Sequence, residues 1–474
     1  MNAPPRAFVA ALLWVAALGA APAHVPIFAD VGGKVYEPGP AVVQRYINYA
    51  RGPLQRRVDA TFCPQGTCLP LYYVDSHNIY CGSGTIDWFK AAADRPAWWL
   101  HSPGGDEVLN AQTRYGRCPS LTAGSENTYY ANYRDAGNQA YWRSYLDAKA
   151  RAARPNQCYF LDDLTYRLAR PSREIGTLDR MLRFEGAELD ALAPYCIWTN
   201  GLGPGGGRYG NALPGGVVPI DAYAKYARAG NVRGVTFEDP LWSAYDRTLR
   251  SANLPVVINT VSRLLAQTRL KIAILDSSAD VDGTSLDRVR RLHTAALWLV
   301  TGDTLDRLVS WLDPHTNARN ARLIGVYPEQ TVVPTRPLKP MGAWTPASSS
   351  RGSGCRDDRM GPDDSHGGMA DLLLACGFDS GNPAGVYARE YGVCYAATHA
   401  IGGCAAIVNL EDISVRVDQR RLGNAYRYAI GWSGGPLRGV CPADAGCNGA
   451  LDLRARRLGK TIEIPAQDAL LLAE

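Results

Sequence analysis

Short apolar runs, each ending in a polar residue and followed by a helix-like stretch, recur through the first 300 residues. Continuous apolar runs of this length are typical of parallel strands that are buried on both faces. An additional early run lies around Tyr46–Tyr49, and Leu297–Thr301 competes with Lys271–Asp276 for the last position. About eight such units predict an α/β fold of the (β/α)8 TIM-like barrel type. The other runs are Leu71–Asp75, Ala97–His101, Cys158–Asp163, Cys196–Asn200, Gly234–Glu238 and Pro255–Asn259.

The character of the chain changes after about residue 335. Residues 336–368 are rich in Pro, Ser, Gly and Asp and indicate a linker or long loop. The sequence thus predicts a barrel over residues 24–335, a linker over 336–382, and a small antiparallel, β-sandwich-like domain over 383–474. The strand-like runs of this last part are Val386–Arg389, Cys394–Thr398, Ala405–Leu410, Ile413–Val417, Tyr426–Trp432 and Thr461–Ile464.

The first 23 residues have the features of a secretory signal peptide. Arg6 gives a positive start, Phe8–Ala20 is apolar apart from one Gly, and Ala21-Pro22-Ala23 is a small-x-small cleavage site. We therefore expect cleavage near Ala23 and a secreted or periplasmic protein. The alternative, an uncleaved anchor, is disfavoured because the run is shorter than the roughly 20 residues that a spanning helix needs. No membrane insertion of the mature chain is predicted.

The 12 cysteines agree with export, because disulfides are the usual state of cysteines in an oxidising compartment. Cys158 and Cys196 precede neighbouring predicted strands and could pair across them, but the sequence leaves the connectivity open. The basic residues, with a net charge of +5, are spread along the chain, so nucleic acid is not an expected partner. The oligomeric state also stays open. The short-range disulfide candidates are Cys63–Cys68, Cys394–Cys404 and Cys441–Cys447.

Polar residues follow the predicted strands where each strand ends. In a (β/α)8 barrel the carboxyl ends of the strands form the active face, with catalytic groups from several strands. These residues are Asp75, His77, His101, Asp162, Asp163, Asn200, Glu238, Asp239, Asn259 and Asp276.

Two of these strand ends carry adjacent carboxylates, Asp162-Asp163 and Glu238-Asp239. Carboxylates are costly to bury without a partner or a purpose. Hydrolysis of a glycosidic bond needs two of them, one ionised and one holding a proton for the leaving oxygen. The alternative is that they bind arginines or cap the following helices.

Four sequence blocks resemble, in order, a series found in largely uncharacterised bacterial glycoside-hydrolase-like barrel families. Pro96–His101 is similar to P-x-W-F-L, Tyr133–Trp142 to D-x-x-N-P-x-x-R-x-x-W, Tyr159–Asp163 to G-x-F-L-D-D/N, and Gly234–Glu238 to D-G-V-M-x-E. Tyr387–Asn409 is similar to the β-sheet tail that often follows such barrels. The chain departs from the pattern at Ala97 and Trp99, in its cysteine set, and in its Gly-rich insert at 201–216.

The resemblance implies roles for individual residues. Asp162 matches the nucleophile and Glu238 the general acid/base, and a looser similarity to retaining α-glycosidases, with these groups on strands four and six, implies retention of configuration. The expected substrate is a carbohydrate, and the alternative is a non-catalytic carbohydrate-binding protein on a degenerate barrel. The residues expected to bind substrate are Asp163, Asp75, His77, His101, Trp198, Asn200, Asp239, Trp242 and Asn259.

Other motifs are weaker. No cofactor or metal is predicted, because the chain has seven His and no HExxH. Gly431–Gly435 fits the G-x-S-x-G esterase motif around Ser433, but Pro436 follows at once and prevents the helix that a nucleophile elbow needs.

Overall fold

The computed structural model describes most of the elements that the apolar runs predict. The described residues are 27–28, 71–75, 78–80, 91–92, 94–105, 110–112, 127–151, 158–162, 172–174, 196–200, 232–238, 242–243, 248–249, 254–277, 283–301, 307–313, 327–338, 372–375, 385–396, 399–435 and 448–474.

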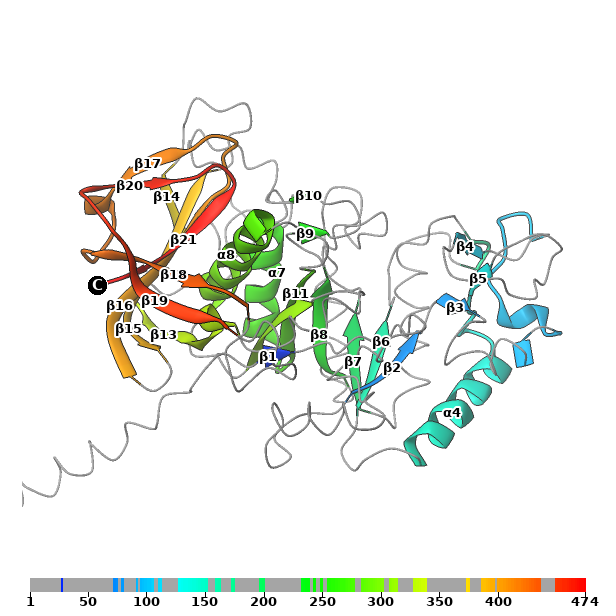
Figure 1. Cartoon of the computed structure of the whole chain (residues 1–474). Helices are drawn as coiled ribbons and strands as arrows, with labels where there is room; N and C mark the ends of the chain where they lie inside the picture. Colours follow the sequence, from blue (N-terminus) through cyan, green and yellow to red (C-terminus); the bar gives the residue numbers. More distant parts are fainter. Residues whose placement is uncertain are drawn as a thin grey trace, which may run out of the picture.

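A seven-stranded parallel sheet forms the first part of the chain (Figure 1). Each strand lies beside the next parallel strand in the sequence, and the first strand pairs with the last. This is the order of strands in a (β/α) barrel. The closing pair, β1 with β2, is not among the pairs in the described part of the chain, so the eight-stranded barrel stays a prediction. The order is β1 (Ile27–Phe28), β12 (Leu308–Asp313), β11 (Lys271–Ser277), β8 (Val232–Glu238), β7 (Ile197–Asn200), β6 (Cys158–Asp162) and β2 (Leu71–Asp75).

Two predicted strands of this sheet are helical, and these predictions were wrong. Pro255–Asn259 lies within helix α7 (Leu254–Gln267), and residues 297–300 end helix α8 (Gly283–Val300). The last parallel strand is instead β12. The buried residues of α7 follow helical spacing, and a short apolar run does not by itself distinguish a buried strand from such a helix. These residues are Ile258, Val261, Leu264 and Leu265.

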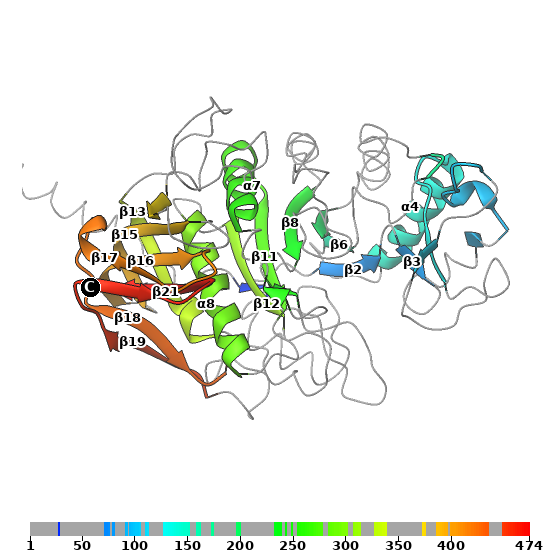
Figure 2. The same ribbon diagram turned by 90° about the horizontal axis from the view of Figure 1, so that it is seen from above.

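Ala97–His101 is also not a strand of the parallel sheet. Pro96–Trp98 forms a 3-10 turn, and Trp99 then makes an antiparallel bridge to Ala131. This segment belongs to a separate unit with helix α4 (Ala136–Arg151) and a three-stranded sheet, at the right of Figures 1 and 2. Trp98, Trp99 and Leu100 are buried, which explains why the run looked like a buried strand. The sheet has the order β3 (Asn78–Tyr80), β5 (Asn127–Tyr130), β4 (Asn110–Gln112).

The last part of the chain is antiparallel, as predicted. Two predicted runs, Val386–Arg389 and Cys394–Thr398, belong to one strand, β15 (Val386–Ala396). Val332–Pro337, at the predicted division near residue 335, is strand β13 and pairs with β15. The domain boundaries themselves remain predictions. The sheet order is β13, β15, β16 (His399–Asn409), β21 (Asp468–Ala473), β18 (Tyr428–Ser433), β19 (Ala450–Arg457); β14 (Leu373–Ala375) also pairs with β15, and β17 (Val415–Asp418) pairs with β20 (Thr461–Ile464).

One predicted disulfide is confirmed. Cys394 on β15 and Cys404 on β16 are bonded, and both are fully buried. Cys196 is also disulfide-bonded. Cys158 begins β6, and its pairing stays a prediction. The other candidates, Cys63, Cys68, Cys441 and Cys447, lie outside the described residues.

Helix α8 lies between the two large sheets (Figure 2). Arg290, on α8, is only 1% exposed, and its guanidinium donates to both carboxylate oxygens of Glu329 at 2.6 Å. It also donates to the Gly434 carbonyl at 2.9 Å, and the rings of Tyr327 and Trp432 lie 4.6 and 5.2 Å away. The buried charge is therefore fully surrounded by partners.

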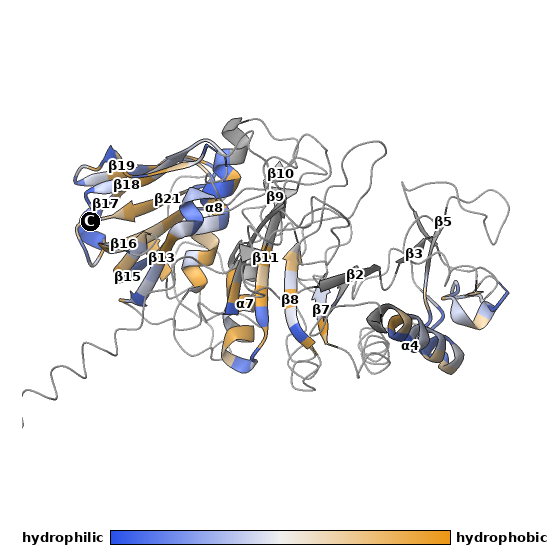
Figure 3. Cartoon of the chain, turned by 60° about the horizontal axis from the view of Figure 1, so that its bottom comes forward, coloured by the Kyte–Doolittle hydropathy of each residue, from blue (hydrophilic) through white to orange (hydrophobic). Residues whose placement is uncertain are grey.

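Further polar contacts hold α8 to the C-terminal sheet. Arg291 forms an ion pair with Asp468 at 2.7 Å. The Tyr391 hydroxyl hydrogen-bonds to the carbonyl oxygen of Trp298, near the end of α8. Figure 3 shows apolar residues along α7 and β11 on the other side of this interface. No helix in the described ranges is long and apolar enough to cross a membrane.

We predict that Glu329→Gln lowers the free energy of unfolding by about 3–5 kcal/mol, because it leaves the buried Arg290 charge without its counterion. Urea unfolding followed by circular dichroism measures this. The matched control is Glu463→Gln, whose ion pair with Arg416 is exposed and should contribute less than about 1 kcal/mol. Equal losses in both variants would contradict the prediction.

Candidate functional site at the carboxyl ends of the parallel strands

The register of the parallel sheet brings predicted site residues to neighbouring strand ends. Asp75 of β2 is the direct partner of Asp162 of β6. Leu161 pairs with Thr199, so the following residues, Asp162 and Asn200, also lie side by side. Asn200 in turn pairs with Thr236, two residues before Glu238 on β8. The polar residues therefore form a row across β2, β6, β7 and β8.

The residues of this row occupy one face of the sheet. Partnered residues of neighbouring strands, and residues two apart on one strand, share a face. Phe160 pairs with Trp198 and Trp198 with Gly234, which places Asp162, Asn200 and Glu238 on the same face as Trp198. We refer to Asp75, Asp162, Asn200 and Glu238 as the carboxylate row.

The opposite face of the sheet is apolar. It carries Val235 and Phe237 of β8 and Ile272 and Ile274 of β11, each at most 1% exposed. By the same alternation, Asp276 belongs to this opposite face, because its neighbour Leu275 is the partner of Glu238. The polar residues of the strand ends are thus divided between two faces, and the carboxylate row is confined to one.

Trp198 lies one step below the row and is packed within the sheet. Its indole is 1% exposed, and Nε1 donates to Thr236 Oγ1 at 2.7 Å. A Cβ atom at Gly234 would lie 2.5 Å from the ring, so only glycine leaves room for it there. The surroundings of Trp198 are those of a packing residue.

Asp162 and Glu238 are two strands apart, and Glu238 lies two residues beyond Thr236, which is level with Asn200. Their backbones are therefore roughly 12 Å apart. Glycosidases need carboxyl groups about 5–5.5 Å apart for retention and roughly 6.5–9.5 Å for inversion.

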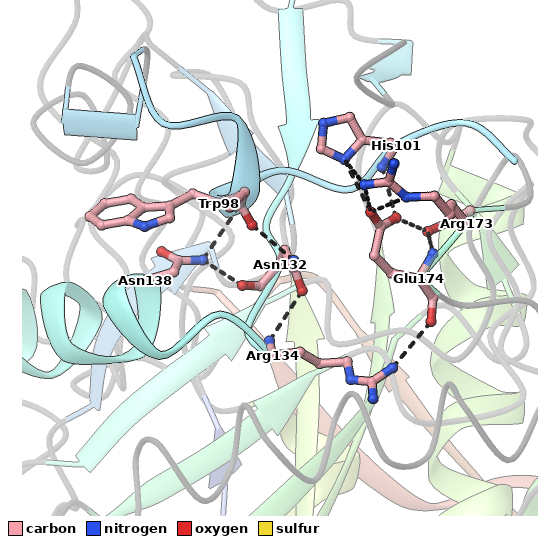
Figure 4. Close-up of polar contacts among 9 residues, drawn as sticks. Trp98, His101, Asn132, Arg134, Asn138, Arg173 and Glu174 are labelled. Carbon is pink, nitrogen blue, oxygen red and sulfur yellow. Dashed lines mark hydrogen bonds and ion pairs between the residues drawn. The ribbon is translucent and has the colours of Figure 1, made fainter. Parts of the chain in front are cut away.

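The second polar cluster joins two connections that leave this end of the sheet (Figure 4). His101 lies in the connection from β2 to α4, and Glu174 lies in the chain that follows β6. Glu174 Oε2 accepts from the His101 backbone N–H at 2.9 Å, and Oε1 lies 3.1 Å from His101 Nδ1. The contact therefore ties together the connections after the two strands that carry Asp75 and Asp162.

Glu174 receives further donors from its own loop. Ser172 Oγ donates to Oε2 at 2.8 Å, and Arg173 donates to Oε1 at 3.0 Å. Burial raises the pKa of Glu174, but hydrogen bonds from the His101 backbone, Ser172 and the His101 ring outweigh it, so the pKa lies below its ordinary value of 4.5. Both Glu174 Oε1 and Arg173 Nη2 face His101 Nδ1, at 3.1 and 3.4 Å, so Nδ1 is the ring nitrogen that this cluster engages.

Two of the sequence blocks that carry the resemblance pack against each other beside this cluster. Asn138 Nδ2 donates to the carbonyl oxygens of Asn132 and Trp98 at 2.9 and 3.5 Å. Asn132 Nδ2 donates to the Ala97 carbonyl, and Asp135 Oδ1 accepts from the Asn138 N–H at the start of α4. The asparagines of the block thus hold the backbone that leads to His101, as Figure 4 shows.

The other predicted site residues fall in three groups. His77, Asp163 and Asp239 lie outside the described residues. Trp242 is on the short strand β9 (Trp242–Ser243), which pairs with β10 (Thr248–Leu249).

Asn259 lies inside helix α7, so its predicted place at a strand end was wrong. Ser433 ends strand β18 and is followed by a bend at Gly434 and Gly435, not by a helix.

Sequence reasoning missed Glu174, Ser172 and Asp313. Asp313 ends β12 as the partner of Ser277, on the face of the carboxylate row. Its signal was the apolar run Leu308–Leu312 ending in a polar residue, which is the same pattern as the other strands. Glu174 lies 12 residues beyond the end of β6, and no local sequence pattern marks it.

No family model matches the chain, and no curated protein does. The solved structures to which the chain is similar include Amy13B of Eubacterium rectale, with 12% identity, coverage of 95% of this chain and 87% of that one, and a TM-score of 0.36. They also include the isomaltulose synthase SmuA of Protaminobacter rubrum, with 9% identity, coverage of 91% and 88%, and a TM-score of 0.42.

A third similar structure is the glycoside hydrolase domain of PelA from Pseudomonas aeruginosa, with 14% identity, coverage of 57% of this chain and 92% of that one, and a TM-score of 0.32.

The depressed pKa of Glu174 predicts a pH dependence of stability. Its carboxylate stabilises the fold above pH 4.5, the ordinary pKa, and this contribution is lost as the pH falls through the lower pKa of the folded state. Glu174→Gln should therefore lower the unfolding free energy at pH 7 and reduce its decrease on acidification to about pH 3.

Urea unfolding at several pH values tests this prediction. The control is Asp94→Asn, at an exposed position, which should leave the pH profile unchanged. A Glu174→Gln profile parallel to that of the wild type would show that the carboxylate does not contribute in this way.

Proposed function

We propose that the protein is a secreted glycoside hydrolase that acts on an extracellular polysaccharide or oligosaccharide through Asp162 and Glu238. The observation that carries the proposal is the register of the parallel sheet, which puts both residues in one row on one face at its carboxyl end. In this reading the sheet closes into a (β/α)8 barrel with the row at its active face.

The proposed reaction uses the two residues in different protonation states. Asp162, as the nucleophile, attacks the anomeric carbon while Glu238 protonates the leaving glycosidic oxygen. A covalent glycosyl-enzyme forms and the leaving sugar departs with that proton. Glu238 then removes a proton from water, which attacks the anomeric carbon and releases Asp162 with overall retention.

Neighbouring residues are assigned binding roles. Asp75 and Asn200 flank Asp162 in the row and would hydrogen-bond sugar hydroxyls. His101, with Nδ1 engaged by Glu174, would offer Nε2 to a hydroxyl near the connections after β2 and β6. The contact between His101 and Glu174 would keep these connections at the rim of the site fixed while a glycan binds.

The second candidate is a carbohydrate-binding protein without catalysis. It is favoured by the departures of the chain from the family pattern at Ala97 and Trp99 and in the Gly-rich insert at 201–216. Both candidates bind glycans at the same face, and they differ in whether a bond is broken.

Substitution of the carboxylates distinguishes the two candidates. We expect Glu238→Gln to lower kcat/KM by about 10²–10⁴-fold, the usual contribution of a general acid or base, and Asp162→Asn to lower it at least as much. Binding of the glycan should persist in both. The measurement is release of reducing ends from a polysaccharide panel by the oxidised protein, with ligand binding measured in parallel.

Asp276→Asn is the matched control, because it removes a carboxylate from the same end of the sheet but on the opposite face. Its activity should stay near that of the wild type. If no glycan in the panel is cleaved but one is bound, the binding protein is the correct reading. If Asp276→Asn abolishes turnover and Asp162→Asn does not, the assignment of the row fails.

A further inference from the structure

A group of cations lies at the free edge of the C-terminal sheet. Strand β19 is the last strand in the sheet order, and its only strand partner in the described part of the chain is β18. We define the basic edge as Arg427, Arg454, Arg456, Arg457 and Lys460, all of which are exposed.

The members of the basic edge are held together by backbone contacts. Arg457 is the register partner of Tyr428, which follows Arg427 in the chain. The Leu458 N–H donates to the Arg427 carbonyl at 2.8 Å. The Lys460 carbonyl accepts from the Gln419 N–H at 2.9 Å, so this residue lies next to the turn that begins there. Cations from two separate stretches of sequence therefore meet at one corner of the sheet.

These cations have no acidic partners among the described residues. Ion pairs nearby use other arginines, Arg416 with Glu463 and Arg420 with Asp418. The Arg454 guanidinium lies 5.4 Å from the centre of the half-buried Tyr428 ring, which positions the charge without neutralising it. The Asp452 carboxylate accepts from the Arg454 backbone N–H at 2.8 Å, so one acidic group lies beside the five cations. The excess of positive charge at this edge attracts anions.

We propose that the basic edge is a binding site for an acidic polysaccharide, one that carries carboxylate groups on its sugars. Arg454 and Arg456 are two residues apart on an extended strand, so their backbones are about 7 Å apart along it, which suits a polymer with regularly spaced charges. Guanidinium groups bind carboxylates with two parallel hydrogen bonds.

This site is separate from the carboxylate row and does not require catalysis there. It also has a competing explanation, since charged side chains on an edge strand protect it from pairing with other chains. The two explanations differ in the sign of the charge that they need. Edge protection is satisfied by either sign, whereas binding of a carboxylated polymer requires cations.

The experiment measures the affinity of the full-length oxidised protein for fluorescently labelled polygalacturonate, by anisotropy, with neutral dextran as the reference. The wild type should bind polygalacturonate and not dextran, and binding should weaken between about 50 and 500 mM salt because exposed charges are screened. Arg454→Glu/Arg456→Glu should reduce the affinity by about tenfold or more, since two exposed ionic contacts are reversed. Arg454→Gln/Arg456→Gln should give an intermediate loss.

The control is Arg233→Glu/Arg269→Glu, which makes the same change in net charge at exposed positions beside the parallel sheet. It should retain the affinity of the wild type within about twofold, because its cations lie away from the basic edge.

Unchanged binding by Arg454→Glu/Arg456→Glu, or an equal loss in the control, would overturn the proposal. Tighter binding of labelled duplex DNA or of phosphatidylglycerol vesicles than of polygalacturonate would overturn it too. Asp162→Asn should bind polygalacturonate at the basic edge like the wild type, so failure of the proposed hydrolase activity and failure of this site give different results.

Discussion

Helix α8 is the element on which both halves of the structure depend, because it is buried by the parallel sheet on one side and by the C-terminal sheet on the other. Its residues from Ala295 to Val300 are at most 4% exposed, and Arg290 is buried with them. A charge in such a place is tolerated only with a close counterion and further hydrogen bonds. Glu329, the Gly434 carbonyl and two aromatic rings meet that need, and each comes from the C-terminal side of the chain. The counterion of Arg290 therefore joins α8 to the C-terminal part of the chain, together with the Arg291–Asp468 ion pair.

The register of the parallel sheet determines where the residues of the candidate site lie. In a parallel sheet every strand ends at the same edge, so polar residues that follow separate apolar runs are brought together without any contact between them being specified. Alternation then divides them by face, which keeps Asp162 and Glu238 together and puts Asp276 on the other side. The carboxylate row requires no particular loop conformation. It results from the order of the strands and from the alternation of residues between the two faces of the sheet.

Most strands of the parallel sheet could be predicted from the sequence. Leu71–Asp75 was predicted to the residue, and β6, β7, β8 and β11 within a few residues, because each is an apolar run ended by a polar group. The roles assigned to Asp162 and Glu238 follow from the same pattern and remain predictions.

The failures have physical causes. Pro255–Asn259 is apolar because one face of α7 is buried, and Ala97–His101 is apolar because it fills the core of a separate unit with α4. A run of apolar residues indicates that a segment is buried. It does not indicate whether that segment is a strand or a helix, or against which element it packs. Glu174 could not be found for a different reason. Its importance comes from contacts with His101, which is 73 residues away in the chain.

The contact between His101 and Glu174 links two connections that leave the parallel sheet. The carboxylate row lies on strands that are paired with their neighbours, and Glu174 acts on the chain beyond two of these strands. Five hydrogen-bond donors on its carboxylate link His101, in the connection from β2 to α4, with residues 172–174, which follow β6. In the proposed enzyme the catalytic groups would lie on paired strands, and Glu174 would hold the connections beside them. Substitution of Glu174 should therefore change glycan binding more than it changes the arrangement of the row.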